Sequence, residues 1–244
     1  MIPVTTTLMG KGSFPSSHPL YLGMLGTHGV YVANKAAHEA DLFIILGARV
    51  GDRAMGSITG IAEHAAIVHI DIDPAEIGKN IGTNIPVVGD VKLVLEALLE
   101  EVSDLQNEQW INKIKKWKDE HPVKVLEPRP AGAVNPRYVL GLLSELAGPD
   151  AIVTTEVGQN QIWAANHLRT EKPRTFITSG GLGTMGYGLP ASVGAKIGSP
   201  KATVVAISGD GSFQMNMQEI GTIIQENLDI KIIIFNNSRL GMVR

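Results

Sequence analysis

The chain contains no cysteine among its 244 residues. This absence excludes disulfide bonds, thiolate metal sites and cysteine nucleophiles, and it does not constrain the cellular compartment. No apolar run approaches the roughly 20 residues that are needed to cross a bilayer. The net charge of −3 offers no strongly basic surface for nucleic acid or for an anionic membrane. We therefore expect neither a nucleic-acid partner nor a membrane partner.

The beginning of the chain also lacks a targeting signal. Residues 1–12 contain no secretory apolar region and are not an Arg-rich transit peptide, so a cytoplasmic location is the default expectation. The 44% hydrophobic and 18% charged content is typical of a globular protein. The length allows one large domain or two ordinary ones. Several of the 27 glycines end apolar runs, as the turns between strands and helices require.

The C-terminal part of the chain has the most informative pattern. A β-branched run at 203–207 ends at Ser208-Gly209-Asp210-Gly211, and apolar residues at helical spacing predict a helix over about 214–227. A second β-branched run at 230–235 ends at Asn236-Asn237. This order predicts two parallel strands joined by a right-handed helical crossover.

Parallel strands present their carboxyl ends at one edge of the sheet, where ligands of open α/β folds bind. Asp210 and Asn237 would therefore meet at that edge, and Mg²⁺ prefers such oxygen ligands together with phosphate oxygens. Gly209 and Gly211 allow close backbone approach, and the following helix offers free amides to an anion. A single Gly-Asp-Gly is more often a simple turn, and Asn-Asn more often a cap. Their placement on successive strand ends favours a Mg-diphosphate site.

This spacing, Gly-Asp-Gly followed about two dozen residues later by Asn-Asn, resembles the signature of thiamine-diphosphate enzymes. The resemblance implies that the metal ligands are the side chains of Asp210 and Asn237 and the backbone carbonyl of Arg239. It also implies a set of contacts with thiamine diphosphate in this half of the chain. These are Gly158, Gln159, Asn160, Gly183, Met185, Gly209, Gly211, Ser212, Asn237, Gly241 and Met242.

A glycine-rich segment at 178–190 precedes this unit. So many glycines disfavour a regular element and suggest that the backbone passes close to something. A flexible linker is the alternative, but apolar residues interleave with the glycines and favour a packed loop. By the family resemblance, Met185 is the wedge that bends the cofactor, and the Gly183 carbonyl accepts from its 4′-amino group. These two are the expected catalytic positions.

The first half alternates apolar runs with helix patterns. Strands are predicted at 2–7, 41–47, 66–74 and 85–90, and helices at 31–39 and 91–102. Gly, Arg or Asp follows several strands, which favours nucleotide binding. The alternative is that Asp71 and Asp90 are caps and that Arg49 is a surface ion-pair partner. A clean G-x-G-x-x-G after a strand is missing, which disfavours a nicotinamide site.

The segments GMLGTHG, GARVGDR, IDIDPAEIGKN and IPVVGD resemble the central domain of acetohydroxyacid (acetolactate) synthase large subunits. In that family the domain binds FAD in a structural role. One departure is Val50-Gly51-Asp52, where many members read FDD. The positions that the resemblance assigns to FAD are Gly23, Met24, Gly26, Thr27, His28, Gly29, Gly47, Arg49, Asp71, Ile72, Asp90 and Val91.

The expected fold is α/β, with two Rossmann-like open parallel sheets flanked by helices, both incomplete. We expect a central FAD-type domain at 1–120, a linker at 121–135 and a thiamine-diphosphate/Mg domain at 136–244. Asn135-Pro136 predicts a helix start, and Trp110 and Trp117 are interpreted as packing anchors.

The resemblance implies decarboxylation of pyruvate and its ligation to a second 2-keto acid, pyruvate or 2-ketobutyrate, through a carbanion-enamine on the cofactor, in branched-chain amino acid biosynthesis. Family members take an activating glutamate from an N-terminal domain of a partner subunit, which we do not find. Glu156 and Glu219 are not assigned to that role.

We therefore expect a homodimer or tetramer, a possible small regulatory subunit, and an inactive chain when it is alone. Another flavin-containing thiamine-diphosphate enzyme (pyruvate oxidase or glyoxylate carboligase) and a non-catalytic nucleotide-binding module remain as alternatives.

Overall fold

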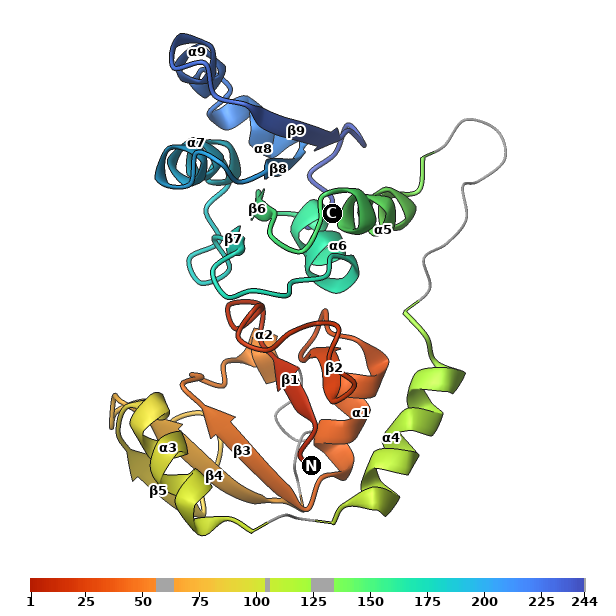
Figure 1. Cartoon of the computed structure of the whole chain (residues 1–244), viewed down its shortest axis with the longest axis vertical. Helices are drawn as coiled ribbons and strands as arrows, with labels where there is room; N and C mark the ends of the chain where they lie inside the picture. Colours follow the sequence, from red (N-terminus) through yellow and green to blue (C-terminus); the bar gives the residue numbers. More distant parts are fainter. Residues whose placement is uncertain (56–63, 104–105, 124–133, 244) are drawn as a thin grey trace. The chain divides into compact units, whose positions relative to one another are not determined.

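The computed structural model describes residues 1–55, 64–103, 106–123 and 134–243 (Figure 1). The chain forms two compact units. The central unit consists of Met1–Thr7 and Leu22–Pro122, and the C-terminal unit of Leu8–Tyr21 and Val123–Arg244. Among the residues that the structure describes, no helix combines the length and the apolar character needed to cross a membrane.

The central unit is built on a parallel sheet in the order β3-β4-β5, beside a two-stranded sheet of β1 and β2. Its strands are β1 (Val4–Thr6), β2 (Tyr21–Met24), β3 (Leu42–Leu46), β4 (Ala66–Asp71) and β5 (Ile85–Val88). Its described helices are α1 (Tyr31–Glu39), α2 (Asp52–Met55), α3 (Val91–Glu101) and α4 (Glu108–Glu120). The predicted strands and helices in this half are therefore confirmed, although several strands are shorter than predicted, and β2 and α2 are additions that the sequence did not predict.

In the described part of the central unit, two clusters of buried apolar side chains contribute to the core. One contains Ile45 of β3 and Ile67 of β4, packed with Leu25. The other joins α1 to α4 and contains Trp117, whose ring meets that of Trp110 edge to face at 5.6 Å between centroids. The tryptophans are therefore packing anchors, as predicted, and their partner is α1.

The C-terminal unit contains a four-stranded parallel sheet in the order β7-β6-β8-β9. Its strands are β6 (Ile152–Thr155), β7 (Phe176–Thr178), β8 (Val204–Gly209) and β9 (Ile230–Phe235). Its described helices are α5 (Pro136–Leu146), α6 (Gln159–His167), α7 (Gly188–Gly198), α8 (Asp210–Met215) and α9 (Glu219–Gln225). The α/β class with parallel sheets and flanking helices is thus confirmed.

Strand β8 is the centre of this unit. Val204, Val205, Ala206 and Ile207 are at most 1% exposed, because β8 has strand neighbours on both sides and helices on its faces. On one face, Leu189 of α7 and Ile223 of α9 pack on Ala206. A continuous apolar run rich in β-branched residues is the expected sequence for such a strand.

The predicted helix over 214–227 is wrong in two respects. The helical conformation begins at Asp210, and it is interrupted between α8 and α9. The interruption falls at Asn216, whose side-chain amide donates to the carbonyl oxygen of Gly186 at 2.6 Å. This contact joins residues 30 positions apart, so periodicity within the segment could not predict it. The predicted loop at 178–190 is also too long, since α7 begins at Gly188.

Residues 8–21 belong to the C-terminal unit, although we expected all of 1–120 in the central domain. Thr170 holds this segment through two hydrogen bonds with Ser16, each 3.0 Å long. The hydroxyl of Ser17 donates to Glu171 at 2.6 Å, and the Lys11 ammonium donates to the Leu168 carbonyl at 2.8 Å. These partners lie more than 150 positions away in sequence, which local patterns do not report. The other predicted domain boundaries stay predictions.

Lys11 generates a prediction about pH. Burial lowers its pKa to about 8 from an ordinary 10.5, and Glu171 opposes that change. Between these values the unfolded chain binds more protons than the folded one, so the free energy of unfolding should rise with pH from about 8 to about 10.5, by about 3 kcal/mol in total. Denaturant unfolding across this window measures the rise. Lys11→Met should remove it, whereas Lys201→Met, at an exposed position, should keep it. Equal slopes in all three proteins would contradict the assignment.

Candidate functional site

The parallel pairing of β8 with β9 places two predicted metal ligands at one edge of the sheet. Gly209, the last residue of β8, lies opposite Phe235, the last residue of β9. Asp210 follows directly and is half-buried at the start of α8, and Asn237 follows β9 by two residues. The strand ends therefore bring together the segments that the sequence predicted to meet.

Asn237 is held by a third segment, the first turn of α6. Its Nδ2 donates to Oε1 of Gln159 at 3.1 Å, and its Oδ1 accepts from the backbone N–H of Arg239 at 3.0 Å. An amide oxygen has two lone pairs, so one remains for a further partner. The two hydrogen bonds fix which end of the amide is the oxygen. The side chain of Arg239 is exposed, which agrees with a role for its backbone carbonyl.

Close approaches at glycines bring three segments, 158–160, 209–212 and 237–241, to one place. A Cβ at Gly211 would lie 2.6 Å from Cδ2 of Leu240, and a Cβ at Gly241 would clash with the Gln159 side chain. A Cβ at Gly209, the first residue of the second segment, would lie 3.1 Å from Nδ2 of Asn160. A side chain at any of these positions would therefore have to displace the end of a neighbouring side chain.

Ser212 and Met242 are two further predicted contact residues of this edge. The hydroxyl of Ser212 is buried and accepts from the Gly209 N–H at 3.3 Å, so it closes the local turn. Met242 is 50% exposed in the turn that follows Gly241. The contacts assigned to these residues stay predictions.

The first turn of α6 lies at the same edge. Gly158 precedes this nine-residue helix with φ of 145°, and the first amides of a helix have no acceptor within it. Asn160 is 4% exposed, and its Oδ1 has no hydrogen-bond partner among the described residues. Buried amide oxygens are normally satisfied, so this atom has room for a further donor, such as a bound water molecule. The edge thus combines free backbone donors with carboxylate and amide oxygens.

The glycine-rich loop leading to α7 has a tight turn at its apex. The N–H of Gly183 donates to the Ser179 carbonyl at 2.9 Å, and that of Thr184 donates to the Ser179 hydroxyl at 3.1 Å. Gly183 has a φ of +75°, Leu182 is 90% exposed and Met185 is half-buried. The segment is therefore an ordered loop rather than a flexible linker, while the roles of Gly183 and Met185 stay predictions.

In the central unit, a cavity of about 650 Å³ opens between the ends of the parallel strands and α3. Its described lining includes Gly47, Asp71, Ile72, Asp90 and Val91, all of which the resemblance assigned to FAD. The remaining described lining residues are Lys92, Leu95, Glu96 and Leu99. The cavity thus gathers residues from three separate strand ends with one apolar helix face.

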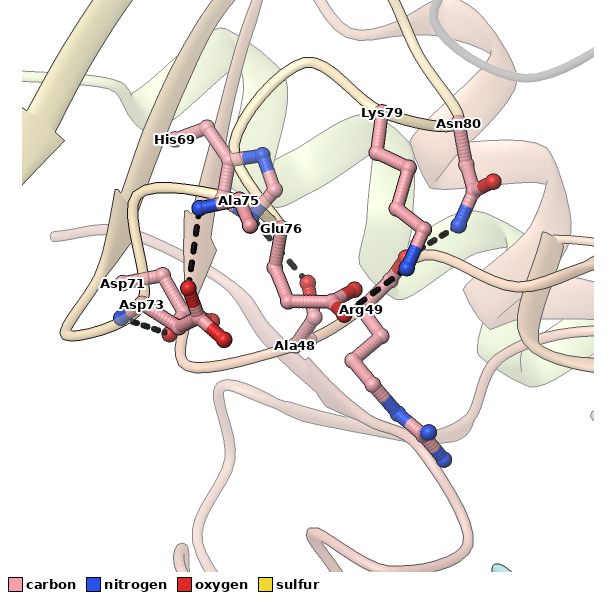
Figure 2. Close-up of polar contacts among 9 residues, drawn as sticks. All are labelled: Ala48, Arg49, His69, Asp71, Asp73, Ala75, Glu76, Lys79 and Asn80. Atoms are coloured by element: carbon pink, nitrogen blue, oxygen red, sulfur yellow. Dashed lines mark hydrogen bonds and ion pairs between the residues drawn. The ribbon is translucent and has the colours of Figure 1, made fainter.

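The two aspartates of the cavity also act as caps. Asp71 accepts from the N–H of Asp73 at 3.0 Å (Figure 2), and Asp90 accepts from the N–H groups of Lys92 and Leu93 at 2.9 and 3.3 Å. The cap interpretation is therefore confirmed for both carboxylates. Because a carboxylate has about four acceptor positions, these bonds leave room for a ligand hydroxyl.

His69 is a residue that the sequence reasoning missed. It is 1% exposed, its Nε2 lies 3.1 Å from the Ala48 carbonyl oxygen, and its Nδ1 accepts from the Gly78 N–H at 3.4 Å. The ring therefore donates through Nε2 and tethers the turn after β3. Asn80 supports the same turn by donating to the Arg49 carbonyl at 2.7 Å, and Figure 2 shows the Arg49 guanidinium pointing away from this network. The sequence signal that could have identified this residue is a histidine within the apolar pattern of β4.

The turn at 23–29 is shaped by the chain itself. A Cβ at Gly26, where φ is +111°, would clash with the backbone of Arg53, and one at Gly29 would clash with the backbone of Met24. Met24 is buried, whereas Thr27 and His28 are exposed. This turn, including Gly23, is not among the described lining residues of the cavity. Its predicted contacts with FAD stay predictions.

Comparison with known families gives matches for both units. Residues 1–98 match the central domain of thiamine pyrophosphate enzymes, and residues 156–244 match their C-terminal TPP binding domain. The first match covers the half that contains the cavity, and the second covers the half that contains Asp210 and Asn237. The chain belongs to the thiamine pyrophosphate enzyme family.

Within that family, the chain is similar along its whole length to acetolactate synthases. It is 49% identical to the acetolactate synthase large subunit of Cyanidium caldarium, over all of this chain and 42% of that protein. It is 48% identical to the large subunit of Parasynechococcus marenigrum, over all of this chain and 39% of that protein. A probable large subunit of Methanocaldococcus jannaschii is 48% identical, over 99% of this chain and 42% of that protein. The chain thus spans about two fifths of the length of these relatives.

Two glycines of α7 give a matched test of the packing beside the glycine-rich loop. A Cβ at Gly188 would lie 2.7 Å from backbone atoms of Thr155 and Glu156, whereas one at Gly194 meets nothing within 4 Å. Gly188→Ala should lower the free energy of unfolding by about 1–3 kcal/mol because the backbones must separate. Gly194→Ala should raise it by up to about 1 kcal/mol through helix propensity. Urea denaturation measures both, and equal effects would refute the close contact.

Proposed function

We propose that this chain provides the Mg-thiamine diphosphate and FAD binding units of an acetolactate synthase. The reaction is the decarboxylation of pyruvate and its ligation to a second 2-keto acid, pyruvate or 2-ketobutyrate. The similarity to acetolactate synthase large subunits along the whole chain supports this proposal. The observation that carries it is the meeting of Asp210 and Asn237 at the ends of two adjacent parallel strands.

The residues at this edge fit a magnesium ion that carries a diphosphate. The carboxylate of Asp210, the free lone pair of Asn237 Oδ1 and the carbonyl of Arg239 are hard oxygen ligands. The first-turn amides of α6, beside Gly158, can donate to diphosphate oxygens. A water molecule on the metal would satisfy the orphaned amide oxygen of Asn160.

When bound, thiamine diphosphate supplies the electron sink that the decarboxylation of a 2-keto acid requires. The contribution of this chain is to bind and orient it. Asp210 and Asn237 would hold the diphosphate end through the metal. Gly183 and Met185, in the loop before α7, would contact the ring end. The residues proposed for the two ends of the cofactor therefore lie in different segments, the ends of β8 and β9 and the loop before α7.

The cavity of the central unit suits the adenosine part of FAD. It combines the apolar side chains of Ile72, Leu95 and Leu99 with the carboxylates of Asp71 and Asp90. Apolar walls can sandwich an adenine ring, and an acidic residue at a strand end commonly binds ribose hydroxyls. In the proposed function FAD has a structural role. A dimer or tetramer of catalytic subunits, a small regulatory subunit and a cytoplasmic location belong to the same proposal.

The metal site is tested by Asp210→Ala. Loss of the one carboxylate ligand should weaken the binding of Mg²⁺-thiamine diphosphate to the full chain by about tenfold to a hundredfold. Titration calorimetry with and without Mg²⁺ measures this change. Asp229→Ala is the matched control, since Asp229 is exposed and pairs with Lys231 at the other end of β9. Unchanged affinity in Asp210→Ala would sink the assignment.

The flavin site is tested by filling the cavity from α3. Leu95→Trp places a large ring in the lining and should weaken FAD binding by about tenfold or more, because it occupies volume that the adenosine needs. Leu98→Trp is the control on the same helix, at a position 40% exposed and outside the described lining. Quenching of flavin fluorescence reports the affinity. If both variants bound FAD as the unmodified chain does, the cavity would not be its site.

A further inference from the structure

Glu156 is a buried carboxylate that follows β6 and is 0% exposed. Its Oε2 accepts from the N–H of Gly186 at 2.7 Å. Its Oε1 accepts from the N–H groups of Gly188 and Leu189 at 2.8 and 3.3 Å. A single side chain therefore takes backbone donors on both sides of Tyr187, at the junction between the glycine-rich loop and α7.

The backbone donors of this junction need acceptors, and the two oxygens of Glu156 provide them. The first amides of an α-helix lack intrahelical acceptors, and the residue before α7, Tyr187, supplies no side-chain cap. Glu156 supplies the acceptors instead, from about 30 positions earlier in the chain. Burial raises the pKa of Glu156, and the N–H donors of residues 186–189 oppose that rise. Both oxygens point at donors, so a neutral acid would lose an acceptor there.

Other side chains hold the carbonyl groups of the same junction. The hydroxyl of Thr154 donates to the Gly188 carbonyl at 2.8 Å, and Asn216 donates to the Gly186 carbonyl at 2.6 Å. Both the backbone N–H and the backbone carbonyl of Gly186 and of Gly188 are thus hydrogen-bonded. By contrast, Leu182 at the apex is 90% exposed. The loop is fixed at its end near α7 and open at its tip.

We propose that Glu156 is a positioning residue for cofactor binding. Its carboxylate sets the conformation of 183–186 before the cofactor arrives, so that the Gly183 carbonyl and the Met185 side chain are already oriented toward the ring end of thiamine diphosphate. Ordering the loop in advance lowers the entropy lost on binding. The inference rests on the proposed function, and it assigns Glu156 no contact with the cofactor.

The first measurement is amide hydrogen exchange in the full chain without cofactor. In Glu156→Gln, the side-chain oxygen can still accept from Gly188 and Leu189, but the NH₂ group faces the Gly186 N–H. Exchange at Gly186 should therefore accelerate by at least about tenfold, the scale of one hydrogen bond to a charged group, and exchange at Leu189 should change less. Unchanged exchange at Gly186 would overturn the proposal.

The second measurement compares two ligands, Mg²⁺-thiamine diphosphate and Mg²⁺-pyrophosphate. Pyrophosphate has no ring end, so it depends only on the strand edge that carries Asp210 and Asn237. Glu156→Gln should weaken thiamine diphosphate binding by about tenfold and leave pyrophosphate binding unchanged. Equal weakening of both ligands would show a merely structural role and overturn the proposal. Failure of the unmodified chain to bind either ligand would instead overturn the proposed function.

Two further variants complete the design. Glu226→Gln removes the same charge from an exposed position of the same unit, and it should change neither exchange at Gly186 nor either affinity. Glu156→Asp keeps the charge on a shorter side chain and should recover part of the preference for thiamine diphosphate. It also provides the test if Glu156→Gln does not fold. If Glu156→Asp lost the whole preference for thiamine diphosphate over pyrophosphate, this result would contradict positioning by the carboxylate.

Discussion

The parallel pairing of β8 with β6 and β9 is the constraint on which the C-terminal unit depends. Each strand in a parallel ladder ends on the same side, so the residues that follow Thr155, Gly209 and Phe235 must emerge together. The parallel pairing alone therefore places these residues at one edge of the sheet. Both faces of β8 are buried, so a shift by one residue would move each of its side chains to the opposite face and disturb the packing there.

Buried polar side chains near strand ends hold the loops that follow other strands. His69 in β4 tethers the turn after β3, and Glu156 after β6 caps α7. Lys11 performs a similar task for residues 8–21 through the Leu168 carbonyl. Burial of each of these polar groups costs free energy. Hydrogen bonds to backbone groups that would otherwise lack partners offset that cost. The apolar strands provide the platform, and a few polar residues define the loops.

The sequence predicted what depends on local order along the chain. The β-branched runs placed β8 and β9, and the residues after them placed Asp210 and Asn237 at one edge. It did not predict the break at Asn216 or the position of residues 8–21. Both depend on hydrogen bonds between residues 30 or more positions apart, and no periodicity encodes such a contact. Glu156 was visible as a strand-end acid, but the three N–H groups it accepts from were not.

Glycine illustrates the same limit, since one residue type occurs for two physical reasons. Gly186 and Gly188 have no room for a Cβ, because Asn216 and the backbone of β6 stand against them. A Cβ at Gly181 or Gly183 would meet no atom of the described residues within 4 Å, and Gly183 needs only its positive φ. The glycines near α7 are thus explained by the packing of this chain. Those at the tip leave open space beside the loop, which the proposed contact between the cofactor ring and the Gly183 carbonyl requires.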